Sequence, residues 1–110
     1  MDGDTPRQLG WVIMWYPRAS WYELAVADRQ RLTEGFHRVV QEAKAVGTTL
    51  IGSFYCRSQS EYEGVTWWVA PHLDAIETLS DELDRAGLRT HFVTRCLAGT
   101  RDDSLFGTPI

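Results

Sequence analysis

LGWVIMWY, residues 9–16, is apolar on both faces of an extended chain, because large apolar side chains occupy odd and even positions alike. GVTWWVA, residues 64–70, shares this feature. Strands of this kind are typically covered on both sides. A proline, Pro17 or Pro71, follows each stretch directly, and proline interrupts a central strand because it has no N–H to donate. The sequence therefore predicts two central strands, at 9–16 and 64–70.

Two further segments have helical periodicity. In residues 26–46 the apolar side chains recur at intervals of three and four, which places them on one helix face. Gly47 follows the last of them, as glycine often does at a helix C-terminus. Asp74 and Glu77 resemble an N-terminal capping box for a second helix, and Gly87 follows its last apolar residue. The sequence thus predicts two helices, each closed by a glycine.

Residues 48–57 and 89–97 are predicted to be two more strands. The order along the chain is then strand, helix, strand, strand, helix, strand. Right-handed crossovers fold this order into a ferredoxin-like βαββαβ sandwich of the α+β class. Its four-stranded antiparallel sheet has the spatial order fourth, first, third, second, with both helices on one face.

The whole pattern fits one domain. The chain has 110 residues, which is an ordinary size for a single domain. The domain is predicted to cover residues 9–100. Residues 1–8 are predicted to form a frayed N-terminus, residues 101–110 an irregular C-terminal tail, and residues 17–27 a loop inside the domain.

Charge and cysteine content exclude several classes of protein. The net charge of −4 provides no basic field for nucleic acid or anionic lipid. No apolar run approaches the ~20 residues of a membrane span, and the N-terminus lacks the features of a signal peptide. Cytoplasmic localisation with reduced thiols is therefore predicted. Cys56 and Cys96 fall on opposite edge strands, about 14 Å apart at ~4.8 Å per strand spacing, which is too far for a disulfide.

Two helices can cover only one face of this sheet. The other face of the two central strands is also apolar, and leaving it in water would expose an unusually large apolar patch. The simplest cover is a second copy of the chain, packed sheet against sheet. The sequence therefore predicts a homodimer in the form of a dimeric α/β barrel.

Three stretches resemble a known group of proteins. They are WYELAVADR at 21–29, CRSQSEYEGVTWWVAPHLDAIETLSDEL at 56–83 and HFVTRCLAGT at 91–100. They are similar to the dimeric α/β barrel superfamily, and within it most similar to the darcynin-like proteins, a small group without an established function. The resemblance covers residues 11–100. Ala25 departs from it, because the pattern has a helix-capping Ser at this place.

The superfamily resemblance implies several activities. Its members include cofactor-independent monooxygenases of aromatic polyketides, polyketide cyclases, haem-degrading monooxygenases, chlorite-dismutase-like haem proteins and small stress proteins. In several of them the ligand occupies a cavity between helices and sheet. Haem degradation relies on an Asn–Trp–His set, which this chain cannot complete because it contains no Asn.

Polar side chains on the two predicted edge strands are the candidate catalytic residues. His91 and Arg95 share one face of the strand at 89–97, where His supplies an acid or base and Arg holds a carboxylate or enolate. Tyr55, with Arg57 beside it as a substrate-binding residue, lies on the strand at 48–57. The structural alternative is two solvated edge strands without a chemical role.

Aromatic side chains are the candidate substrate-binding residues. Trp15, Trp21 and Tyr22 flank the segment that leads into the first helix, and Trp68 lies on a central strand. Aromatic side chains clustered at a strand end favour a planar ligand. The alternative is that they simply fill the core.

His37 lies at the flank of the first helix, three residues after Glu34. Two such Glu-x-x-His motifs on paired helices form a di-iron site, but this chain has one, so no metal site is predicted. His37 is a further candidate for substrate binding. In an alternative reading, His37 or His91 is the axial ligand of a haem.

These patterns lead to three functional hypotheses. The first is a small tailoring enzyme that acts on an aromatic or polyketide-like molecule, monooxygenase- or cyclase-like and without a cofactor. The second is a non-catalytic small-molecule-binding or stress-related protein, and the third is a haem-binding protein. In each case the expected partners are a second copy of the chain and a small hydrophobic or aromatic ligand, with no nucleic acid and no membrane.

Overall fold

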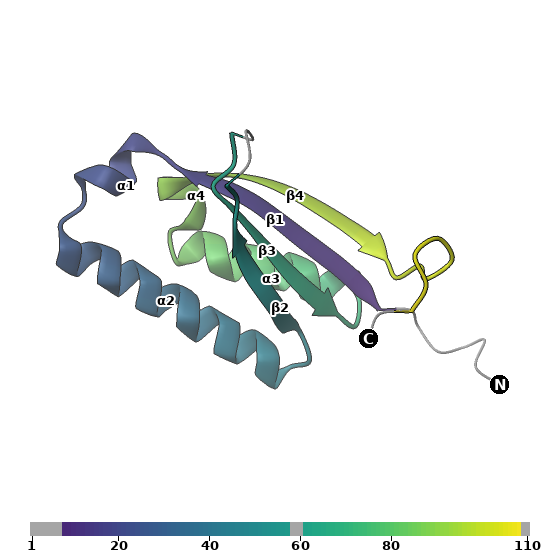
Figure 1. Cartoon of the computed structure of the whole chain (residues 1–110). Helices are drawn as coiled ribbons and strands as arrows, with labels where there is room; N and C mark the ends of the chain where they lie inside the picture. The colour runs from purple at the N-terminus through teal and green to yellow at the C-terminus, as the bar shows by residue number, and fades with distance from the viewer. Residues whose placement is uncertain (1–7, 58–60, 109–110) are drawn as a thin grey trace.

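The computed structural model describes residues 8–57 and 61–108, and Figure 1 shows its arrangement. Its elements, in chain order, are β1 (Leu9–Pro17), α1 (Ala19–Glu23), α2 (Val26–Ala45), β2 (Thr49–Tyr55), β3 (Gly64–Ala70), α3 (Leu73–Arg85), α4 (Leu88–His91) and β4 (Phe92–Thr100).

The four strands form one antiparallel sheet in the order β2-β3-β1-β4. This is the predicted order, and the ferredoxin-like α+β fold is confirmed. In Figure 1 the two long helices, α2 and α3, lie together on one side of the sheet. The strands β1 and β3 are central, as their apolar character on both faces predicted.

The core lies between the sheet and the long helices. The side chains of β1 alternate between the two faces, and Trp11 and Ile13 are buried in the core. Trp68 of β3 lies opposite Trp11 in register, with ring centroids 6.4 Å apart. Each long helix contributes one stripe of apolar side chains to the core, as its periodicity predicted. Their buried members are Val39 and Ala43 of α2, and Ile76, Leu79 and Leu83 of α3.

Two short helices correct the sequence interpretation. Residues 19–23 form α1 within the predicted loop, and Arg29 stabilises it by donating hydrogen bonds to the carbonyls of Trp21 and Tyr22. The predicted strand at 89–97 begins instead at Phe92 and runs to Thr100, because residues 88–91 form α4. Gly87 precedes α4 with a φ of 104°, a left-handed conformation that glycine adopts without steric cost.

Helix termini agree with the sequence in part. Gly47 has a φ of 94° after α2, as predicted for a C-terminal glycine. Ala25 begins α2 without a side-chain cap, so the departure from the capping Ser leaves this terminus without one. Asp74 was predicted to cap α3, but the N-cap is His72, whose Nδ1 accepts a hydrogen bond of 3.1 Å from the Ala75 N–H.

We expect His72→Ala to lower the free energy of unfolding by about 1 kcal/mol, the usual cost of losing an N-cap. His72→Asn should restore most of it, because Asn is a favoured cap. Urea denaturation measures both. If Asp74→Ala lowers the free energy of unfolding more than His72→Ala does, then Asp74 and not His72 is the residue that caps α3.

Both cysteines are free. Cys56 directly follows β2 and Cys96 lies on β4, at opposite edges of the sheet, as predicted. Burial raises the pKa of the Cys96 thiol. Within the described part of the chain, no helix combines the length and the apolar character that crossing a membrane requires.

Candidate functional site

A cavity of about 420 Å³ lies between α2 and the sheet, closed at one end by the short helices. Its volume is within the range of ligand-binding pockets, roughly 300–1,000 Å³. Every described helix and strand contributes to its wall. The lining residues are Ile13, Trp15, Trp21, Thr33, Phe36, His37, Val40, Leu50, Ser53, Thr66, Trp68, Leu83, Leu88 and Phe92.

The cavity has an apolar floor and a polar mouth. Ile13, Trp68 and Phe92 are buried, and they belong to the sheet. Thr33 and His37, on α2, are exposed, as is Ser53 at the end of β2. A ligand that enters past these side chains would therefore bury its apolar part against the sheet.

Phe92 is the centre of the aromatic wall. The ring of Trp21 lies 4.8 Å from it, that of Trp15 5.5 Å in an edge-to-face arrangement, and that of Phe36 6.3 Å, all between centroids. These separations are typical of favourable aromatic pairs. Arg29 lies outside this wall, 5.7 Å from the Trp21 ring, in cation–π geometry.

Trp15 is held over a glycine. Gly64 is its partner in the β1–β3 register, and the indole ring occupies the space where a Cβ of residue 64 would be. The ring therefore lies directly against the backbone of the neighbouring strand. The absence of a side chain at Gly64 thus fixes where Trp15 meets the cavity.

The polar groups that the strands contribute to the wall include one connected chain and one unpaired donor. Trp15 Nε1 donates to Thr66 Oγ1 at 3.4 Å, and the Ser53 and Thr66 hydroxyls are 3.2 Å apart. Trp68 is only 3% exposed, and its indole N–H has no hydrogen-bond partner among the described residues. A buried donor without a partner is rare in proteins, so a ligand atom or a water molecule is expected to accept from it.

The cavity brings together four of the predicted site residues: Trp15, Trp21, His37 and Trp68. Trp15 and Trp68 line it from adjacent central strands, Trp21 from α1 and His37 from α2. Among the described residues that line it, His37 is the one with a titratable side chain. The cavity thus combines the predicted aromatic group with the flank histidine of the first long helix.

His91 and Arg95 do not share a face, which corrects the prediction. His91 ends α4 and is hydrogen-bonded through Nδ1 to the Ser20 hydroxyl at 3.0 Å. Its ring lies 6.4 Å from that of Trp21, outside the cavity lining. Arg95 lies opposite Met14 in register and so points to the other face of the sheet. The four-residue spacing does not place the two side chains on one face, because the chain is helical up to His91 and the strand begins only at Phe92.

Three other predicted residues also lie outside the cavity lining. Tyr55 is exposed at the end of β2, and Arg57 is exposed two residues further on. Tyr22 lies on α1 with its hydroxyl 3.5 Å from a Glu63 carboxylate oxygen. Desolvation and that carboxylate raise the pKa of the Tyr22 hydroxyl. The structure therefore brings none of the three to the cavity.

Sequence reasoning missed Phe92, Thr66, Thr33 and Phe36 as cavity residues. Thr66 carries a signal that was available: it has the same strand parity as Trp68, so both had to face the same side. Thr33 and Phe36 lie within one helical turn of His37 and share its side of α2. The face on which Phe92 lies could not be predicted in this way, because the helix α4 ends directly before it and β4 begins three residues later than the sequence indicated.

Haem binding stays a prediction. His37 is the histidine that the lining offers as an axial ligand, and none of the described residues that line the cavity is Arg or Lys. The described lining therefore provides no cationic partner for the two propionates of a haem. The described residues also contain no cluster of three or more His, Cys, Asp or Glu side chains that could hold a metal ion.

Comparison with known proteins identifies similar folds. No family model and no curated protein matches the chain. A variant chlorite dismutase from Candidatus Nitrospira defluvii matches with a TM-score of 0.75 at 14% identity, over 94% of this chain and 41% of that one. This chain thus spans less than half of that protein.

Two similar structures match over nearly their whole length. A dimeric protein of unknown function with a ferredoxin-like fold from Bacteroides fragilis has a TM-score of 0.55 and 13% identity, over 86% of this chain and 96% of that one. SnoaB, a cofactor-independent oxygenase from Streptomyces nogalater, has a TM-score of 0.52 and 13% identity, over 91% and 98%. The narrower resemblance to darcynin-like proteins stays a prediction. In its fold, this chain is a ferredoxin-like α+β domain of the kind found in all three.

Proposed function

We propose that this protein binds a neutral, hydroxylated aromatic molecule in the cavity between α2 and the sheet, and acts on it as a cofactor-independent tailoring enzyme of the monooxygenase or cyclase type. The observation that carries the proposal is the buried indole N–H of Trp68, which has no partner among the described residues and belongs to a residue that lines this largely apolar cavity. Such a donor suits a ligand oxygen, and it stabilises negative charge that develops there.

The chemistry begins with a proton. His37 takes it from a phenol or from an acidic C–H of the bound molecule, and the remaining electron pair is delocalised over the ring system as a phenolate or enolate. Trp68 Nε1 and the Thr66 hydroxyl donate hydrogen bonds to the anionic oxygen. A carbanion of this kind is the starting point for attack on a carbonyl, which closes a ring, and for electron transfer to O₂, which leads to oxygenation.

The similarity to SnoaB supports the oxygenase form of this proposal. That protein is described as a cofactor-independent oxygenase, and this chain matches it over nearly its whole length. None of the described residues that line the cavity is Arg or Lys, and this supports a neutral ligand rather than a carboxylate. Burying an anion without a partner costs a free energy of roughly several kcal/mol.

Three related probes test the site. We expect 1-naphthol to bind more tightly than naphthalene, which has no oxygen, and than 1-naphthoate, which brings a charge. Thr66→Val should weaken 1-naphthol binding about tenfold, or roughly 1.4 kcal/mol, because it removes the hydroxyl that is proposed to bond the ligand oxygen. Naphthalene binding should stay unchanged. Isothermal titration measures each affinity.

Thr94→Val is the matched control, because Thr94 lies on β4 outside the cavity lining. It should leave all three affinities as they are. Tightest binding of 1-naphthoate, or equal binding of naphthalene and 1-naphthol to the unsubstituted protein, would contradict a neutral oxygen-bearing ligand.

The open face of the sheet supports assembly as a homodimer. Strand alternation places Val12, Met14, Val65 and Val69 there, on the face that the helices leave uncovered. Trp67 is 48% exposed and Leu97 63% exposed on the same face. The Bacteroides fragilis protein of this fold is described as dimeric. A second copy packed sheet against sheet would remove this apolar surface from water.

A further inference from the structure

A hollow of about 610 Å³ lies on the open face, at the end of the sheet where β1 begins and β4 ends. Its floor is backbone, because Gly10 of β1 and Gly99 of β4 are partners in register. Gly10 lies beside Trp11, which faces the core, so strand alternation puts both glycine positions on the open face. We call this feature the glycine hollow.

The hollow has room for side chains that the chain itself does not supply. A Cβ at Gly99 would meet no atom within 4 Å, and one at Gly10 would meet only the Gly99 carbonyl oxygen, at 3.9 Å. The walls are apolar and half-buried or exposed: Trp67, Ile51 and Leu97 surround the bare backbone. Backbone uncovered between large apolar side chains is typical of a socket.

The same end of the sheet carries a projecting turn. Leu105 is 81% exposed and Phe106 92% exposed, and neither lines the hollow. Figure 1 shows the chain turning back on itself beyond the end of β4. We call these two residues the Leu105–Phe106 knob. Two large apolar side chains held in water at the rim of an apolar socket favour insertion into another molecule.

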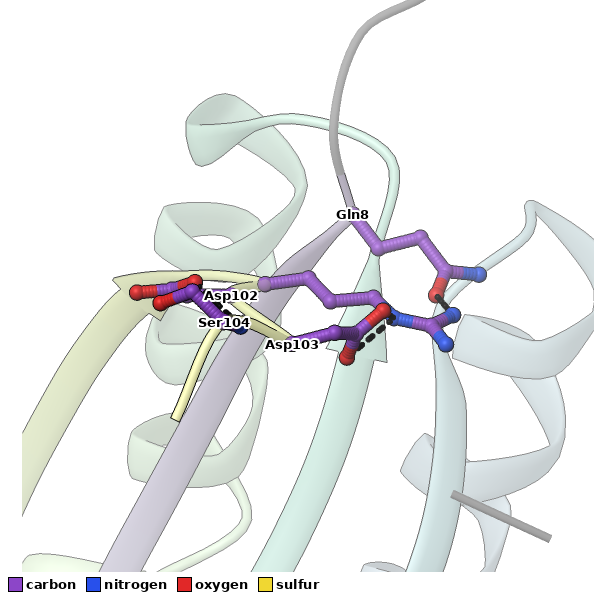
Figure 2. A network of polar contacts seen from close by, with 5 residues as sticks. Gln8, Asp102, Asp103 and Ser104 are labelled. Carbon is purple, nitrogen blue, oxygen red and sulfur yellow. Dashed lines mark hydrogen bonds and ion pairs between the residues drawn. The ribbon is translucent and has the colours of Figure 1, made fainter. Parts of the chain in front are cut away.

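Polar contacts hold this turn in a defined shape, as Figure 2 shows. Arg101 pairs with Asp103 at 3.2 Å and donates to the side chain of Gln8 at 3.3 Å. The Ser104 N–H donates to Asp102 Oδ1, and the Gly107 N–H donates to the Asp103 carbonyl, both at 2.9 Å. Arg101 and Asp103 also form part of the hollow's rim. The network therefore fixes the knob relative to the socket.

We propose that the Leu105–Phe106 knob of one copy inserts into the glycine hollow of a second copy, with the Phe106 ring lying on the Gly10–Gly99 backbone. The exchange is reciprocal, so that two knobs and two hollows are satisfied and the assembly closes as a dimer. This proposal rests on the homodimer proposed above and states which residues join its two halves.

The chain contains a precedent for this contact. The Trp15 ring lies on Gly64 of the neighbouring strand in the same way, occupying the space of the missing side chain. An aromatic ring over a strand glycine covers backbone that would otherwise be wet. Because knob and hollow are at the same end of the sheet, the two-fold axis must bring equivalent strand ends of the two copies together.

The first test is the dimer dissociation constant, measured by sedimentation equilibrium on the full chain. Phe106→Ser should raise it at least tenfold. Gly99→Val should do the same from the other side, because it fills the socket at a position with free space in the single chain. Val46→Ser is the matched control: Val46 is exposed at the end of α2, on the helix side of the sheet. It should leave the constant unchanged, and circular dichroism should show all three variants folded.

The second test identifies the contact directly. A photoreactive benzoylphenylalanine at position 106 is placed in unlabelled protein, which is mixed with ¹⁵N-labelled protein that lacks the photoreactive group. We expect crosslinks from position 106 to labelled peptides containing Trp67 or Leu97. Crosslinks confined to unlabelled peptides of the same chain, or to the helix side of a labelled chain, would overturn the proposal.

Different results would overturn the homodimer and the insertion of the knob into the hollow. A chain that sediments as a monomer at tens of micromolar would overturn both the homodimer and the knob. A dimer whose dissociation constant is unaffected by Phe106→Ser and by Gly99→Val would overturn the knob alone and leave the sheet-to-sheet dimer in place.

Discussion

His37→Gln is expected to raise the pKa of a bound nitronaphthol by about one to three units, the usual effect of losing a nearby opposite charge. Under the proposed mechanism His37 of the unsubstituted protein takes the proton, and the resulting imidazolium would stabilise the coloured naphtholate beside it. Gln keeps a hydrogen-bonding group of similar size but cannot take a proton. The titration is followed by visible absorption, with the protein in excess over the dye.

The control for this experiment is His91→Gln, because His91 is bonded to Ser20 and lies outside the cavity lining. It should leave the titration where it is. A shift from His91→Gln and none from His37→Gln would return the catalytic role to the residue that the sequence favoured. If neither variant shifts it while both bind the dye, the protein is a binding protein without a base in its cavity.

Gly64→Ala is expected to lower the free energy of unfolding by about 1–3 kcal/mol, the usual cost of overpacking a tight site. The new methyl group would overlap the six-membered ring of Trp15. A rigid ring cannot bend away, so Trp15 must leave its place against Phe92 and lose its hydrogen bond to Thr66. Chemical denaturation measures the loss, and weaker 1-naphthol binding should accompany it because Trp15 lines the cavity.

Gly35→Ala is the control, because a Cβ there would meet only the Ala86 Cβ, at an ordinary contact distance of 4.0 Å. It should leave the free energy of unfolding unchanged or raise it by about 0.5–1 kcal/mol, since Ala is the better residue inside a helix. A loss from Gly35→Ala equal to that from Gly64→Ala would mean that the effect belongs to glycine substitutions in general and not to the Trp15 contact.

The sheet could be predicted from the sequence because its signals are local. Two strands that are apolar on both faces have to be central, and two periodic helices cover one side of them. Proline and glycine marked most of the boundaries. The errors occurred where the signal was weak. Residues 88–91 contain no apolar period long enough to reveal a single helical turn, and the His72 cap is a residue type that sequence rules do not favour.

For the candidate site, the sequence indicated some of the residues but not how they are arranged in space. Trp15 and Trp68 were expected at a cavity because aromatic side chains on central strands must face either the core or a partner. The sequence indicated His37 as a candidate for substrate binding and not as a catalytic base, because one histidine on a helix flank has no partner in the sequence. Its position at the cavity mouth depends on how α2 packs on the sheet, where the rings of Phe36 and Phe92 meet with centroids 6.3 Å apart.

By itself, the sequence determined the four strands and their order in the sheet, the two long helices, and the existence of an apolar face without a cover. These follow from periodicities of two and of 3.6 along a continuous segment. Only the tertiary structure decided which side chains meet. One helical turn before β4 separated His91 from Arg95, and one missing Cβ placed Trp15. The pairing of Gly10 with Gly99 formed a hollow that neither glycine implies alone. Such contacts join residues far apart in the chain, and no local pattern encodes the distance between them.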